Sequence, residues 1–146
     1  MTQLSLLQAS TIADAALAAG DVHGFSPLAL VVLDAGGHDL VVKRSEAAAF
    51  YRTEIARTKA YGCLGMGMGG RDLAKRAKAV PGFYAALATV TSGGLLPMPG
   101  GVLIRDHDGA IIGAVGVSGD TGGNDEIAAL AGINAAGLVA DPGTDE

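Results

Sequence analysis

One pattern, an apolar run followed by a tight turn and a second β-prone run, occurs twice in this chain and constrains its fold most. The first copy spans Leu28–Val42 and turns at the sequence Asp-Ala-Gly-Gly, while the second spans Val102–Val117 and turns at Asp-His-Asp-Gly. Asp and Gly between two β-branched runs are typical of a β-hairpin. The chain is therefore expected to contain a central, mainly antiparallel sheet built from two hairpins.

Segments with helical periodicity stand before, between and after the two hairpins. Gly20 stands where the first helix should stop, while Ser45 and Asn124 are suited to cap two later helices. Helices are expected at about 5–20, 45–62, 71–79 and 124–139, with one or two further turns at 83–90. Because helices must cover the apolar faces of such a sheet, the predicted class is α+β, with helices layered on the sheet.

Length and composition indicate one domain that associates with itself. A chain of 146 residues can bury one sizeable core, so residues 1–146 are interpreted as a single domain. Hydrophobic residues make up 49% of the chain and charged residues only 17%, which leaves little polar surface to cover the fold. We therefore expect a homo-oligomer in which apolar surface is closed between copies.

Charge and cysteine content exclude several classes of partner. The net charge of −5 argues against nucleic acid, and the basic residues between Arg71 and Lys78 are interpreted as a solvated helix face. No export signal is recognised at Met1–Leu4, and no run of about 18 uncharged apolar residues predicts a membrane span. The single Cys63 excludes an internal disulfide, so the reducing cytoplasm is the expected location. No spacing of histidine, cysteine or carboxylate residues predicts a metal site.

Three segments, taken together, are similar to a known family. They are Val32–Gly37, Thr53–Ala60 and Ile112–Asp120. In this order, and with Gly93–Pro97 similar to the family's Gly-Gly-x-Pro region, the chain resembles the haem-degrading domain family over essentially its whole length. That family includes the GlcG proteins, the HbpS proteins and the C-terminal domain of PduO-type proteins. One departure is Lys43–Ala48, which stands where the family usually has Arg-Met-Asp-Gly-Ala.

The resemblance implies an oligomeric protein that binds haem or another small organic ligand, and in some relatives promotes haem breakdown. Haem iron needs an axial ligand from the protein, and histidine, cysteine and methionine are the usual donors. His23 is the preferred candidate because it follows the first helix, whereas His38 and His107 lie in hairpin turns where a solvated histidine is expected. The remaining donors are Cys63, Met66 and Met68.

The segment Gly116–Asn124 is a second candidate for ligand binding. It places small residues and backbone amides at the start of a helix, an arrangement that can hold a carboxylate or a phosphate. Gly119 and Asp120 are therefore predicted to contact a haem propionate or an organic acid. The alternative is a tight connection between a strand and a helix, because Asp120, Asp125 and Glu126 would repel an anion unless they point away.

A catalytic interpretation rests on Glu54, Lys59 and Asp125. Glu54 and Lys59 belong to the family-like helical segment, and burial of such groups would shift their pKa values and suit them to acid–base chemistry. The alternative is that they are ordinary charges of helix surfaces. Three hypotheses therefore stay open: a haem or small-ligand binding protein, a cofactor-free enzyme acting on a small organic acid or carbonyl compound, and an accessory subunit of a neighbouring enzyme.

Overall fold

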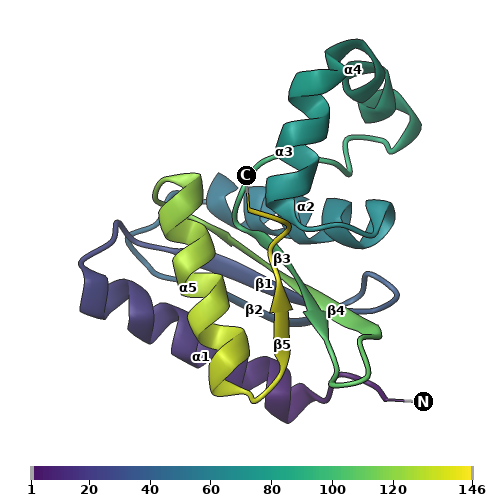
Figure 1. Ribbon diagram of the computed structural model, residues 1–146. Helices are drawn as coiled ribbons and strands as arrows, with labels where there is room; N and C mark the ends of the chain where they lie inside the picture. Colours follow the sequence, from purple (N-terminus) through teal and green to yellow (C-terminus); the bar gives the residue numbers. More distant parts are fainter. Residues whose placement is uncertain (1, 146) are drawn as a thin grey trace.

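The computed structural model describes residues 2–145 and shows a five-stranded antiparallel sheet between helical layers (Figure 1). The elements in chain order are α1 (Leu6–His23), β1 (Ala29–Asp34), β2 (Asp39–Arg44), α2 (Tyr51–Met66), α3 (Gly70–Ala79), α4 (Pro81–Val90), β3 (Gly101–Arg105), β4 (Ile111–Ser118), α5 (Gly122–Ala135) and β5 (Val139–Asp141). The strand order is β2-β1-β4-β3-β5, and every neighbouring pair is antiparallel. The α+β class with a central sheet built on two hairpins is confirmed.

The apolar run of β1 is continuous because both faces of the sheet are covered. Leu30 and Val32 lie in the core formed with α1 and α5, whereas Val31 and Leu33 lie in the core formed with α2. A strand that is buried on both faces carries apolar residues at successive positions instead of at alternate ones. Strand β1 therefore contributes side chains to both cores.

A pair of glycines sets the distance between α2 and the sheet. Gly101 and Gly116 face each other across β3 and β4. A Cβ atom on Gly116 would overlap the carbonyl oxygen of Ala56, and one on Gly101 would lie 2.6 Å from the carbonyl oxygen of Lys59. Glycine is required where two backbones approach this closely. The close contact brings Lys59 to the end of β4.

The expected stop of the first helix at Gly20 is wrong by one turn. Helix α1 continues to His23 and ends at Gly24, whose φ of 70° is the left-handed conformation typical of a helix C-terminus. Gly20 has a packing role instead, since a Cβ atom there would lie 2.7 Å from Cδ1 of Leu28.

The expected start of the second helix at Ser45 is also wrong. The guanidinium group of Arg44 donates hydrogen bonds to the carbonyl oxygens of Ser45 at 3.0 Å and Ala48 at 2.7 Å, which holds these residues in a turn. The helix then starts at Tyr51 and continues to Met66.

The last helix is displaced toward the N-terminus relative to its expected range. Thr121 caps it by accepting a hydrogen bond from the Asn124 amide at 3.2 Å, so α5 starts at Gly122. Gly137, with a φ of 72°, then reverses the chain. Val139, which was expected to end the helix, instead starts β5, which pairs with β3.

Helices α3 and α4 extend away from the layered body on the side of α2 (Figure 1). Within α4 only Tyr84 is buried, and Phe83 and Val90 are 57% and 80% exposed. None of the helices within residues 2–145 has the length and apolar character needed to cross a bilayer.

Candidate functional site

A buried ion pair joins α2 to α5 at the end of β4. Nζ of Lys59 lies 3.0 Å from Oδ2 of Asp125, and both side chains are only 1% exposed. The same ammonium donates to the carbonyl oxygen of Val117 at 3.0 Å, while Oδ1 of Asp125 accepts from the Asp120 amide at 2.9 Å. Two of the predicted acid–base residues, which are distant in sequence, are thus brought into direct contact.

Burial and pairing act in opposite directions on these two groups. Burial lowers the pKa of Lys59 and raises the pKa of Asp125, because it penalises the charged form of each. The attraction between the two charges opposes both shifts. A Cβ atom on Gly100 would lie 2.6 Å from Nζ of Lys59, so the chain at Gly100 closes directly over the pair. The pair is therefore enclosed by the chain and does not line an open cavity.

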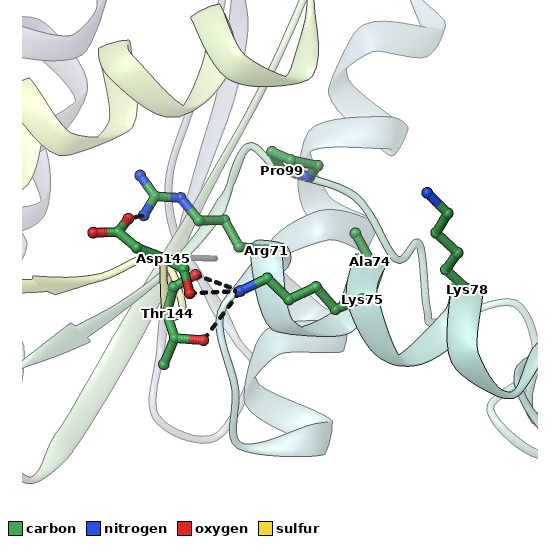
Figure 2. A pocket seen from close by; sticks show the side chains of 7 residues that line it. All are labelled: Arg71, Ala74, Lys75, Lys78, Pro99, Thr144 and Asp145. Atoms are coloured by element: carbon green, nitrogen blue, oxygen red, sulfur yellow. Dashed lines mark hydrogen bonds and ion pairs between the residues drawn. The ribbon is translucent and has the colours of Figure 1, made fainter.

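A second ion pair, which was not predicted from the sequence, joins Arg71 to Glu126, the residue after Asp125. Nε and Nη2 of Arg71 donate to the carboxylate of Glu126 at 2.9 Å and 2.7 Å. Nη1 of Arg71 donates at 2.7 Å to Oδ1 of Asp145, as Figure 2 shows. The hydrogen bond with Glu126 is the main cause of the raised pKa of Arg71. Arg71 therefore links α3 to α5 and to the C-terminal segment.

The anion position predicted at the start of the last helix contains the chain's own carboxylate. The side chain of Asp120 accepts hydrogen bonds from the amides of Ser26 and Thr121, both at 2.7 Å, and from Nδ2 of Asn124 at 2.8 Å. These donors lower the pKa of Asp120 to about 2. The neighbouring Gly119, with a φ of 147°, packs its backbone against residues 27–28. Asp120 and Gly119 thus fix the connection between α1 and β1.

His23 lies at the start of that same connection. Its exposed ring stacks on Phe25, with ring centroids 5.1 Å apart and an angle of 13° between the planes. No hydrogen bond from its ring nitrogens is found within residues 2–145, whereas His38 contacts Asp34 at 3.2 Å and His107 contacts the Gly137 carbonyl oxygen at 2.8 Å. The structure therefore places His23, Gly119 and Asp120 around one loop.

An open hollow of about 380 Å³ lies beside this loop. Its apolar wall includes Leu17, Phe25 and Leu28, and its acidic rim includes Asp21 and Glu46. The two carboxylates on its rim make this surface unfavourable for a second negative charge.

The remaining candidates lie elsewhere. Glu54 is exposed on α2, and its carboxylate makes no hydrogen bond or ion pair with residues 2–145, so it does not join the buried Lys59–Asp125 pair. Cys63 is buried, and burial raises the pKa of its thiol to about 12. Met66 and Met68 are half-buried against the core beneath α2.

The architecture defines a small α+β domain with helices on both faces of one sheet. The ion pair between Lys59 of α2 and Asp125 of α5 joins the two helical layers. A family model for haem degrading protein HbpS-like matches residues 4–134, so this chain belongs to the HbpS-like family. The family resemblance drawn from the sequence is confirmed.

Solved structures share this fold. The crystal structure of a PduOC:heme complex has 26% sequence identity and a TM-score of 0.83, covering 94% of this chain and 98% of that chain. The crystal structure of HbpS has 29% identity and a TM-score of 0.78, covering 92% and 90% of the two chains. Protein ORFY of Klebsiella pneumoniae, at 24% identity, has a TM-score of 0.84 over 94% and 93%, which shows the fold alone. A comparison with curated proteins found no match.

Proposed function

We propose that this protein binds haem and that His23 supplies an axial ligand to the iron. The similarity over 94% of the chain to a protein crystallised with haem carries this proposal, together with membership of the HbpS-like family. Bound haem supplies the redox chemistry of its iron, and the chain supplies a ligand nitrogen and apolar surface.

The residues around His23 fit part of a haem site. Its imidazole has no hydrogen-bond partner within residues 2–145, so a ring nitrogen is available to a metal. Phe25, on which the ring stacks, lines the neighbouring hollow together with Leu17 and Leu28. The other donors fit less well, because Cys63 is buried with a raised pKa and the rings of His38 and His107 are engaged. Since Asp21 and Glu46 would repel propionates, we infer that Asp120 and Gly119 position the His23 loop instead of binding a propionate.

Substitution of His23 tests the assignment. We expect His23→Ala to weaken hemin binding by about tenfold or more, because loss of a ligand should cost at least as much as loss of a residue that only orients one. The measurement is a titration with hemin followed by the Soret band. The matched control is His107→Ala, which removes an exposed imidazole that bonds to the Gly137 carbonyl oxygen. Equal affinity and an unchanged Soret maximum in His23→Ala would contradict the assignment.

Haem breakdown, the activity in the family's description, is a further part of the proposal. The hemin complex provides its test, because breakdown would appear as decay of the Soret band after addition of a reductant under air. A stable band would limit the proposed function to binding.

We also propose that the protein is a homo-oligomer in which a second copy of the chain covers α4. Val80, Phe83 and Val90 are exposed on this helix and its N-cap, and no charged residue occurs between Lys78 and Arg105. A helix of ten residues has marginal stability in water unless one face is packed. A second copy of the chain would bury this apolar surface.

The oligomer is tested by placing a charge on α4. Phe83→Glu is expected to yield a smaller species than the wild type in sedimentation velocity, because burying an unpaired carboxylate in an interface is costly. Leu7→Glu, which changes an exposed leucine of α1, is the control and should leave the assembly unchanged. A wild-type monomer at micromolar concentration would refute the oligomer, and an unchanged Phe83→Glu assembly would exclude this interface.

A further inference from the structure

A hollow of about 340 Å³ lies between α2 and the segment that follows α4. Tyr61 and Met66 line it from α2, while Val90 and Leu95 line it from the end of α4 and from the loop after it. Among residues 2–145, no charged side chain lines this hollow. Since an apolar cavity of about 150 Å³ takes up benzene, the hollow has room for the side chain of a phenylalanine.

Glycines give the hollow its shape. A Cβ atom on Gly62 would lie 2.8 Å from Cδ1 of Leu95, and one on Gly94 would lie 3.1 Å from Cδ2 of Tyr61, so both side chains pack against bare backbone. At Gly65, which also lines the hollow, a Cβ atom would contact nothing within 4 Å. The hollow is therefore present in a single copy of the chain and is open above Gly65.

The exposed face of α4 carries a phenylalanine near one end and reaches the hollow at the other. Phe83, Ala86 and Val90 are spaced by three and four residues, so they share one face of the helix, and all three are exposed. Val90 belongs both to this face and to the wall of the hollow. Phe83 stands seven residues before it, which is about 10 Å along a helix, and so does not fill the hollow of its own chain.

A twofold axis near Ala86 would bring the phenylalanine of each copy to the hollow of the other. In two antiparallel copies of α4 that cross at this axis, Phe83 of one lies opposite Val90 of the other, because the two positions are equally far from the midpoint. The small side chain of Ala86 allows the two helices to approach closely. A twofold contact uses the same surface on both copies, so two phenylalanines fill two hollows and the contact closes on itself.

The distribution of charge favours this surface over the outer face of α1. No charged residue occurs between Lys78 and Arg105, the segment that supplies both Phe83 and the loop side of the hollow. The contact therefore buries no unpaired charge, which would be costly. Helix α1, by contrast, exposes Asp14 and Asp21. Aromatic side chains that fill a pocket are the usual anchors of protein interfaces.

We propose that Phe83 of one copy of this chain inserts into the hollow between α2 and residues 91–95 of a second copy, and that the contact is reciprocal. This inference rests on the proposed homo-oligomer and adds which surfaces meet. The hollow is completed only by the second copy. Helix α4 lies at the outer end of the projecting pair of helices, where another molecule can reach it (Figure 1).

The first test fills the hollow from the side of α2. Gly65→Leu is expected to weaken self-association at least about tenfold, the effect typical of an important interface residue, because leucine occupies the space that Phe83 of the second copy needs. Sedimentation velocity over a concentration series measures the dissociation constant. The matched control is Gly123→Leu, at an exposed helical glycine of α5 where a Cβ atom also contacts nothing within 4 Å.

A double variant tests whether Phe83 and Gly65 face each other across the interface. Phe83→Ala alone should also weaken association, because the hollow is then left unfilled. In the double variant, the leucine at position 65 occupies the place that the phenylalanine has left. The two effects should therefore combine to less than their sum, whereas residues that do not meet have additive effects.

Phe83→Trp reports the surroundings of this position directly, because the chain has no other tryptophan. We expect its emission maximum at a shorter wavelength in the assembled protein than after dilution to monomer. A wild type that is monomeric at micromolar concentration would refute the proposed oligomer and this contact together. If the wild type assembles, the contact alone is overturned when Gly65→Leu associates as tightly as Gly123→Leu, or when the tryptophan emission does not change with assembly.

Discussion

Replacing Lys59 by methionine is expected to lower the free energy of unfolding by about 3–5 kcal/mol, because Asp125 then becomes an uncompensated buried carboxylate. Lys59 fills a space that is 1% exposed, and its ammonium is the partner of both Asp125 and the Val117 carbonyl oxygen. Methionine keeps much of the aliphatic volume, so the effect reports the charge more than the packing. Urea unfolding followed by far-UV circular dichroism measures it.

Two further variants separate the charge from other effects. The double substitution Lys59→Met with Asp125→Leu should recover much of the lost stability, since an apolar pair of similar volume often replaces a buried ion pair without loss. Lys43→Met, which breaks an exposed ion pair with Asp14, should cost less than about 1 kcal/mol. A Lys59→Met variant as stable as Lys43→Met would show that Asp125 is accommodated without its partner.

The same double variant also bears on the enzyme hypothesis. If it folds and still binds hemin, the pair is a structural connection between α2 and α5. If it folds but loses turnover of a small organic acid or carbonyl compound that the wild type converts, the cofactor-free enzyme is favoured instead.

Gly116→Ala is expected to destabilise the protein by about 3 kcal/mol, the upper part of the range typical of overpacked cores. The added methyl group would overlap the carbonyl oxygen of Ala56, and a backbone atom inside a helix cannot move aside as the end of a side chain can. Helix α2 would have to rise from the sheet, which would pull Lys59 away from Asp125. Thermal and urea unfolding of the purified variant give the size of the effect.

Gly65→Ala, in helix α2 against which Gly116 packs, is the matched control. A Cβ atom at Gly65 would contact nothing within 4 Å, so alanine should stabilise α2 by up to about 1 kcal/mol through its higher helix propensity. If Gly116→Ala proved as stable as Gly65→Ala, the close packing of α2 on the Gly101–Gly116 pair would not limit the fold.

The parts of this fold that could be predicted are those encoded by local sequence. The two hairpins each combine a turn containing Asp and Gly with β-prone runs, and the structure forms both. The errors arose where a particular side-chain or strand contact overrides the local propensity. Ser45 resembles a helix cap, yet the Arg44 guanidinium holds it in a turn, and β5 exists only because it pairs with β3.

The candidate site was predicted in part for the same reason. Lys59 and Asp125 were singled out, but no spacing could show that residues 66 positions apart form a pair. The Arg71–Glu126 contact, across 55 positions, had no sequence signal beyond the presence of the charges. For Asp120 the sequence suggested a place for an anion, and the structure supplies that anion from Asp120 itself.

The arrangement of β2 and β5 has a consequence for how copies of this chain can meet. The outermost strands of a sheet present unpaired backbone groups and invite edge-to-edge addition of further chains. Here one edge is β2, where Lys43 and Arg44 are exposed, and the other is β5, which spans only Val139–Asp141 before Pro142. Proline has no amide hydrogen to extend a ladder. Neither edge favours growth of the sheet, so the proposed self-association is expected to use the helices, and open-ended addition of strands is disfavoured in the native state.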